Sequence, residues 1–252
     1  MRACFELMNT MYTTAIEPSG GKFQLYAGVI KPPGADAMCP IYLIYYNGPE
    51  EEGRAYAAPL LALEPMHGEP SMINYAATTG IHKQLEAGNA HHRCTNSTVQ
   101  LDLPIDVDII MALVDDFSAF MAKYPERARP SKLAIELRSF GVTGAVPVSA
   151  MAYASRHKLV NVVMEAQYDQ PELDGVMREE VKNMIMKARS STAEKRKLQG
   201  KSEVLVNANF SSGSEKVNAV FGENLPRLKE IKRKYDPDFI FNKWYPIPPL
   251  EA

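Results

Sequence analysis

Two charged residues of complementary chemistry, Glu136 and Arg138, stand two positions apart in the run KLAIELRS over residues 132–139. The run has the length and composition of a strand, on which alternate side chains point to the same side. Glu136 and Arg138 are therefore expected on one face, and Leu133 and Ile135 on the other. A carboxylate can act as a general acid or base, and a guanidinium can stabilise a developing enolate or hold a substrate carbonyl. We predict that these two residues are catalytic, with a surface ion pair as the alternative.

The same alternation collects further polar side chains on one face of the predicted sheet. In the run over residues 158–167, for example, Val160 and Val162 flank Asn161. A polar sheet face either meets water or lines a pocket. For each side chain, cross-strand hydrogen bonding or core packing is the alternative to substrate binding. The predicted substrate-binding residues are Thr98, Gln100, Asn161, Glu165 and Gln167 for polar groups, with Tyr26 and Tyr46 as aromatic walls.

Histidine and cysteine are arranged in a way that argues against a metal site. His91 and His92 are adjacent and precede Cys94, and His82 lies a few residues upstream. Adjacent side chains on a strand diverge, so we predict no metal here. The cysteines are odd in number, far apart and without a C-x-x-C pair, so reduced thiols are expected at Cys4, Cys39 and Cys94.

Strand-like and helix-like runs alternate along most of the chain. This alternation predicts a mixed α+β protein, and 252 residues are enough for one sizeable core, so we expect a single domain over residues 1–252. The runs predicted as strands are residues 23–30, 41–47, 96–103, 132–139, 158–167 and 203–210, and those predicted as helices are residues 50–63, 106–124, 172–188 and 223–235.

The segment over residues 187–202, KARSSTAEKRKLQGKS, is basic, polar and poor in apolar anchors. Such a composition predicts a mobile loop. A solvated connector is the simpler interpretation, and a lid over a pocket is the other.

Composition limits the classes of partner. The formal net charge is -2, so a clustered basic excess that would favour nucleic acid or an anionic membrane is not indicated. Glu6 interrupts what would have to be the apolar part of a signal peptide, and no later run approaches the length of a membrane span. We expect a cytoplasmic protein whose partners are small molecules or proteins.

The C-terminal residues carry a longer motif. The run SEVLVNANF is followed by VFGENLPRLKEIKRKYDPDFIFNKWYPI. This sequence resembles the C-terminal signature of berberine-bridge-enzyme-like FAD-linked oxidoreductases, in which an aromatic-x-Asn strand precedes G-x-N-Y-x-R-L, a Lys-rich helix and D-P-x-N-x-F. The matching residues are Gly222, Asn224, Arg227, Leu228, Lys232, Asp236, Pro237 and Phe241.

Two upstream segments are also similar to fungal-type members of that family, so the resemblance extends over about residues 23–249. They are YNGPEEEGRAYAAPLLALEP and PVSAMAYASRHKLVNV. The resemblance implies a large antiparallel sheet with helices on one face, as in the substrate domain of the vanillyl-alcohol-oxidase type. It also implies that the open face looks toward a flavin ring and a substrate.

The resemblance also bears on the cofactor, because the family's FAD-binding part carries phosphate-cradling loops and the His, or His and Cys, that often link the flavin. No strand, Gly-rich turn and helix succeed one another here, and Ser19-Gly20-Gly21 is predicted to be a simple turn. We therefore expect no cofactor on this chain, with FAD only if a partner domain supplies it. The motifs depart from the family pattern at Ser155 for His, Leu205 for an aromatic residue, Leu225 for Tyr and Phe239 for Asn.

Three functions follow from this resemblance. The first is a flavin-independent enzyme of specialised metabolism that catalyses cyclisation, isomerisation or cycloaddition by holding a reactive conformer. The second is an FAD-linked oxidoreductase fragment that needs a separate FAD-binding domain, and the third is a non-catalytic binding protein. We expect the open face to be covered by a second copy in a homodimer, by residues 187–202 or by an N-terminal helix.

Overall fold

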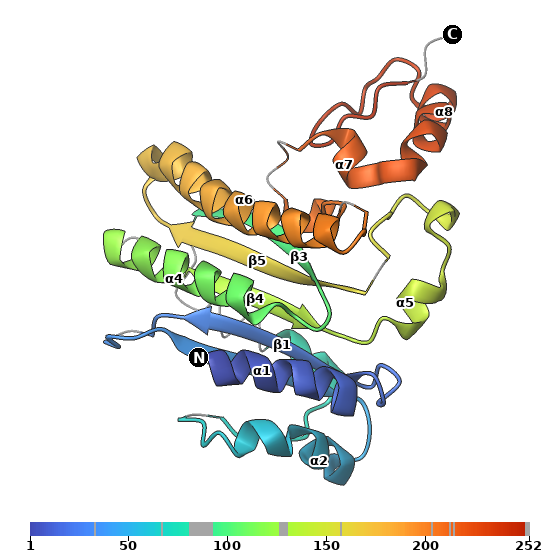
Figure 1. The fold of residues 1–252 in the computed structure, drawn as a ribbon. Helices are drawn as coiled ribbons and strands as arrows, with labels where there is room; N and C mark the ends of the chain where they lie inside the picture. The colour runs from blue at the N-terminus through green and yellow to red at the C-terminus, as the bar shows by residue number, and fades with distance from the viewer. Residues whose placement is uncertain are drawn as a thin grey trace.

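An antiparallel sheet of five strands forms the centre of the protein (Figure 1). The computed structural model describes residues 1–32, 34–66, 68–80, 93–125, 131–156, 158–202, 204–211, 213 and 215–249. The strand order is β2-β1-β4-β5-β3, and every neighbouring pair is antiparallel. The strands are β1 (Phe23–Ile30), β2 (Cys39–Tyr46), β3 (Arg93–Asp102), β4 (Lys132–Leu137) and β5 (Leu159–Tyr168).

Three helices cover one face of this sheet: α1 (Arg2–Met11), α4 (Val107–Lys123) and α6 (Asp174–Leu198) (Figure 1). A fourth, α2 (Glu50–Leu61), packs beside the end of β1, where the Phe23 and Tyr56 ring centroids are 5.4 Å apart. The other described helices are α5 (Gly141–Ala145), α7 (Val217–Phe221) and α8 (Leu225–Tyr235). Single turns occur at Tyr12–Ile16, Tyr75–Ala77, Val148–Ala150, Pro171–Leu173, Ala208–Phe210 and Gly222–Asn224.

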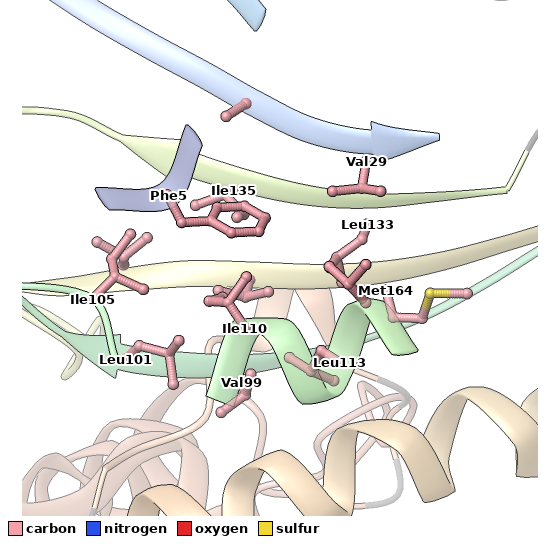
Figure 2. Close-up of a cluster of buried hydrophobic side chains, with 14 of the residues drawn as sticks. Phe5, Val29, Val99, Leu101, Ile105, Ile110, Leu113, Leu133, Ile135 and Met164 are labelled. Atoms are coloured by element: carbon pink, nitrogen blue, oxygen red, sulfur yellow. The ribbon is translucent and has the colours of Figure 1, made fainter. Parts of the chain in front are cut away.

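The core lies between the sheet and these helices, as the alternation of apolar residues requires. Leu133 and Ile135 of β4 are fully buried, and Ile110 of α4 packs among the same cluster (Figure 2). Residue Phe5 brings α1 into this core. Burial of an amphipathic helix stripe on an apolar sheet face supplies most of the favourable free energy of such a layer. The α+β fold with helices on one face of an antiparallel sheet is therefore confirmed.

The sixth predicted strand, over residues 203–210, is wrong. Residues 204–207 have no regular structure, and residues Ala208–Phe210 form a single turn. The backbone N–H of Val206 donates to the carbonyl of Ala219 at 2.8 Å, so this segment bonds to α7 instead of a strand. The side chain of Asn207 accepts from the N–H of Asn209 at 3.1 Å, and this local bond favours a turn.

The predicted loop over residues 187–202 is also wrong, because α6 continues to Leu198. Ala, Arg, Lys and Glu are all good helix formers, so a basic and polar run can extend a helix. Two polar side chains anchor the extension: Thr192 is buried, and Arg196 Nη1 lies 2.5 Å from Asp102 Oδ1 on β3.

Among the described residues, no helix is long and apolar enough to cross a membrane.

Candidate functional site

The open face of the sheet carries a row of four facing residues. Cross-strand pairing places Tyr26 of β1 opposite Glu136 of β4, Glu136 opposite Asn161 of β5, and Asn161 opposite Gln100 of β3. Side chains that face one another in this way lie on the same side of a sheet. The structure therefore brings together residues that lie far apart in the sequence.

A chain of hydrogen bonds links three of these side chains. Ser155 Oγ donates to Gln100 Oε1 at 2.7 Å, and Gln100 Nε2 donates to Asn161 Oδ1 at 2.9 Å. Asn161 Nδ2 then donates to Glu136 Oε2 at 3.1 Å. Gln100 and Asn161 are only 4% and 3% exposed, so the chain fixes the amide orientations and holds the carboxylate of Glu136 in place.

A cavity of about 2020 Å³ opens beside this row. Of the predicted site residues, it is lined by Tyr26, Tyr46, Glu136, Arg138 and Asn161. The other four, Thr98, Gln100, Glu165 and Gln167, lie on the open face but outside its lining.

All four of these residues bond to neighbours on the sheet, Gln100 to Asn161 and Gln167 to Glu165. The contacts of Thr98 and Glu165 cross between strands. Thr98 is 1% exposed, and its hydroxyl donates to the Val162 carbonyl at 3.1 Å. Glu165 pairs with Lys132, with Nζ 3.0 Å from Oε1. Cross-strand bonding, the alternative to substrate contact, accounts for both.

Tyr46 does not lie beside Tyr26. Tyr46 pairs with Phe23, whose side chain is in the core, so its ring starts from the helix-bearing face and lies 5.4 Å from the Tyr56 ring of α2. Its hydroxyl bonds to Glu52, which raises the pKa of Tyr46 to about 12. The neighbouring Tyr45 lies on the open face and lines the cavity, and strict alternation along the strand could have identified it.

Burial and nearby charge make the Tyr26 hydroxyl harder to ionise. Loss of hydration, followed by the negative charges of Glu165 and Glu136, raises the pKa of Tyr26 to about 12. The hydroxyl, which is neutral at physiological pH even at the ordinary pKa of 10.0, therefore keeps its proton and can donate a hydrogen bond to a substrate oxygen.

Arg138 is not paired with Glu136. Among the described residues, no ion pair joins the two side chains, and the Arg138 guanidinium lies 5.4 Å from the ring centroid of Phe140. The surface ion pair that the sequence left open as an alternative is thus not formed. Both side chains line the same cavity instead.

Sequence reasoning missed three polar residues at this site: Ser155, Arg156 and Asn207. Asn207 Nδ2 lies 3.4 Å from Asn161 Oδ1, and Ser155 belongs to the hydrogen-bond chain. Arg156 is 7% exposed and lines the cavity. All three lie in segments that carry the family resemblance, and that resemblance could have identified them.

The diphosphate of FAD needs a Gly-rich turn before a helix, and among the described residues Gly20 and Gly21 bear on that one requirement. Gly20 and Gly21 have φ of +62° and +91°, but they follow a helical turn and precede β1. No other described segment joins a strand to a helix through such a turn. The described part of the chain therefore offers no Gly-rich cradle for the diphosphate.

A metal centre is likewise unsupported by the residues that can be placed. Within the described ranges, no three His, Cys, Asp or Glu side chains cluster in a way that could hold a metal ion. His82, His91 and His92 lie outside the described residues. The three cysteines are free thiols, as predicted: Cys4, Cys39 and Cys94.

The C-terminal motif residues stabilise local structure. Asp236 accepts from the N–H groups of Ile240 and Phe241 at 2.8 and 3.0 Å and pairs with Lys232. Asn224 Nδ2 donates to the carbonyls of Val148 and Met151, both at 3.0 Å. The motif thus fastens the C-terminal segment to the loop that leads to the site.

A positive backbone angle also explains one motif glycine. Gly222 has φ +49°, and a Cβ there would lie 2.9 Å from Leu205 Cδ1. A larger residue would be strained at this φ, and the end of the Leu205 side chain would have to shift.

The sequence of this chain is similar to those of known proteins. The family model described as "Berberine and berberine like" matches residues 207–248. The FAD-linked oxidoreductase pgmH of Aspergillus terreus is 35% identical over 254 residues, which cover 99% of this chain and 51% of pgmH. The FAD-linked oxidoreductase srdI of Neurospora crassa is 26% identical over 215 residues. The chain spans about half the length of these curated relatives.

Solved structures show the same fold at low identity. Physcomitrella patens BBE-like 1 superposes with a TM-score of 0.68 at 12% identity, over 98% of this chain and 51% of that one. Aclacinomycin oxidoreductase superposes with a TM-score of 0.69 at 14% identity, over 96% of this chain and 52% of that one.

Proposed function

Because the chain belongs to the berberine-bridge-enzyme-like family, we propose that its open sheet face binds a small organic substrate and acts on it without a flavin held by this chain. The row Tyr26, Glu136, Asn161 and Gln100 carries this proposal. Here a neutral hydroxyl and a fixed carboxylate converge on one side of a sheet, where a cavity opens.

The proposed reaction is cyclisation, isomerisation or cycloaddition of a reactive intermediate of specialised metabolism. Glu136 Oε2 accepts from Asn161, and Oε1 has no bond from a described side chain. Oε1 can therefore take a proton from an acidic carbon or hydroxyl of the substrate and return it at another atom. Tyr26 would donate to the substrate oxygen on which negative charge develops. General acid–base catalysis of this kind contributes about 10²–10⁴-fold to a rate.

Arg138 would stabilise the same developing charge. Its guanidinium is free of any carboxylate partner among the described residues and lines the cavity. A fixed cation beside an enolate lowers the barrier because the enzyme has already oriented it before the reaction.

A second candidate is an FAD-linked oxidoreductase completed by a separate FAD-binding domain. Its support is the cavity itself, because about 2020 Å³ exceeds the roughly 300–1,000 Å³ of an ordinary small-molecule pocket. A face this open could bind both a substrate and part of another domain. The relatives named FAD-linked oxidoreductase are also about twice as long as this chain.

The proposed partner beyond the substrate is a second copy of the chain, which would cover the open face. Helix α1 and residues 187–198 of α6 lie on the opposite, helix-bearing face, so neither of them covers it (Figure 1). We propose a cytoplasmic location and no nucleic-acid or membrane partner.

A ligand-observed NMR screen of aromatic and polyketide-like small molecules tests the binding proposal. Hits should lose affinity in Tyr26→Ala and Asn161→Ala and keep it in Asn218→Ala, an exposed residue of α7. Hits that bind all variants equally would place the binding site elsewhere. Turnover of a hit by colourless protein would favour the cyclase or isomerase, and turnover only with added flavin would favour the oxidoreductase.

A further inference from the structure

Arg156 is a buried cation that the described residues leave only partly bonded. It lies between α5 and β5 and is 7% exposed. Its Nη1 donates a long bond of 3.4 Å to the Thr143 carbonyl, and its guanidinium lies 5.7 Å from the ring centroid of Tyr153. The Nε is buried without a hydrogen-bond partner.

This arrangement is unusual, because more than about 90% of buried polar groups in proteins are hydrogen-bonded. A buried charge without a partner is costlier still, and proteins retain one where a ligand or an ion completes it. Among the described residues, no carboxylate forms an ion pair with Arg156.

The position of Arg156 suggests what completes it. Arg156, Thr143 and Tyr153 line the cavity that Glu136 and Arg138 also line. Three arginines line the cavity. Arg54 forms an ion pair with Glu50, whereas Arg138 and Arg156 form none with a described side chain. Tyr153 adds an aromatic surface beside one of them.

We propose that Arg156 binds an anionic oxygen of the substrate, a carboxylate or an ionised phenol or enol, and that the substrate class is therefore an organic anion. This inference rests on the proposed function, since it concerns the same cavity. A guanidinium matches such an oxygen because it offers parallel N–H donors, and charge-assisted hydrogen bonds are about twice as strong as neutral ones. Arg156 is a binding residue in this proposal, separate from the proton transfer at Glu136.

A matched pair of probes tests it: 2-naphthoate and the neutral 2-naphthamide, titrated into the full chain and followed by protein NMR. Wild-type protein should bind naphthoate at least about tenfold more tightly than naphthamide. Arg156→Met should abolish this preference and leave the affinity for naphthamide unchanged. Arg156→Lys should keep part of the preference, and Arg233→Met, at an exposed arginine of α8, should keep all of it.

Equal affinity of wild-type protein for the two probes would overturn the proposal, and so would an unchanged preference in Arg156→Met. A purely structural arginine would lower the melting temperature without changing the ratio of the two affinities. If both probes bind equally and both lose affinity in Tyr26→Ala, this inference fails and the proposed function stands. If neither probe binds, both are contradicted. Should Arg156→Met not fold, the wild-type preference and the Arg156→Lys variant still decide the question.

Discussion

The side-chain amide of Gln100 donates a hydrogen bond of 2.9 Å to Asn161 across the β3–β5 pair, and both residues are almost fully buried. Asn161 Oδ1 therefore accepts this bond and a longer one of 3.4 Å from Asn207, and Asn161 Nδ2 donates to Glu136. The rigid part of the site is this amide relay, and the carboxylate at its end faces the cavity. A buried relay of this kind is stable only when each member keeps its partner.

Asn161→Ala should lower the free energy of unfolding by about 1–3 kcal/mol, because it leaves the Gln100 amide buried without an acceptor. Urea denaturation measures the change, with Asn218→Ala on the exposed face of α7 as the control. Equal stability of the two variants would show that the relay does not contribute to the fold.

Glu136→Gln and Arg138→Met should each reduce turnover of an identified substrate by more than about threefold, a loss above roughly 0.7 kcal/mol of transition-state stabilisation. Glu136→Gln keeps the bond from Asn161 but removes the base. Steady-state kinetics would compare both variants with Glu172→Gln, a control substitution at an exposed residue that does not line the cavity. If thermal melting shows that both variants are folded, and both retain wild-type turnover, the reaction takes place elsewhere.

Phe239 should tolerate asparagine better than alanine. Its φ is +54°, in the left-handed region that Asn adopts more readily than other non-glycine residues. The family pattern that this segment resembles, D-P-x-N-x-F, has Asn at this position. Both substitutions remove the ring that lies 5.2 Å from Lys232 Nζ, so their difference isolates the backbone effect. Phe239→Asn should be more stable than Phe239→Ala by about 1 kcal/mol in urea denaturation. Equal stabilities would contradict this explanation.

Glu215 should make stability depend on acid pH. Burial alone would raise the pKa of Glu215, but the hydrogen bond from Tyr245 and the charge of Arg189 hold the pKa of its carboxyl below its ordinary value of 4.5. A depressed pKa in the folded state contributes stability above the unfolded value, and this contribution is lost as the pH falls through the folded value. The contacts are Arg189 Nη2 at 3.2 Å and Tyr245 Oη at 2.9 Å.

This prediction is tested by measuring the urea midpoint of unfolding between neutral pH and about pH 3, a range that spans the ordinary pKa of carboxyl groups. The curve for Glu215→Gln should be lower at neutral pH and should approach the wild-type curve below pH 4.5, the ordinary value for this group. Glu223→Gln, at an exposed carboxylate, should follow wild type throughout. Parallel curves for wild type and Glu215→Gln would exclude the assigned role.

The sequence predicted the sheet well because period-two alternation is a direct consequence of strand geometry. The predicted strand over residues 23–30 coincides with β1, and Glu136 and Asn161 share the face that alternation assigns to them. Alternation does not report tertiary pairing, so residues 203–210 looked like a strand although their backbone bonds to α7. The polar composition of residues 187–198 likewise gave no sign that α6 extends through them. The ion pair that holds this part of the helix joins Arg196 to Asp102 on β3, far away in the sequence.

The site was less predictable, because partners across the fold decide what each polar side chain does. Thr98 and Gln100 look alike in the sequence pattern, yet one bonds to a backbone carbonyl and the other belongs to the relay. Nothing local identifies Arg156 as buried. Its environment depends on Thr143 of α5 and on Tyr153, which lies between α5 and β5.

The most direct test of the central claim is a visible absorption spectrum of the purified 252-residue chain, followed by titration with FAD. The described residues provide an open sheet face but no Gly-rich cradle for a diphosphate, so we predict no flavin absorption and no saturable binding of FAD. Flavin bound at one per chain would contradict it and would assign the chain to flavin-dependent oxidation.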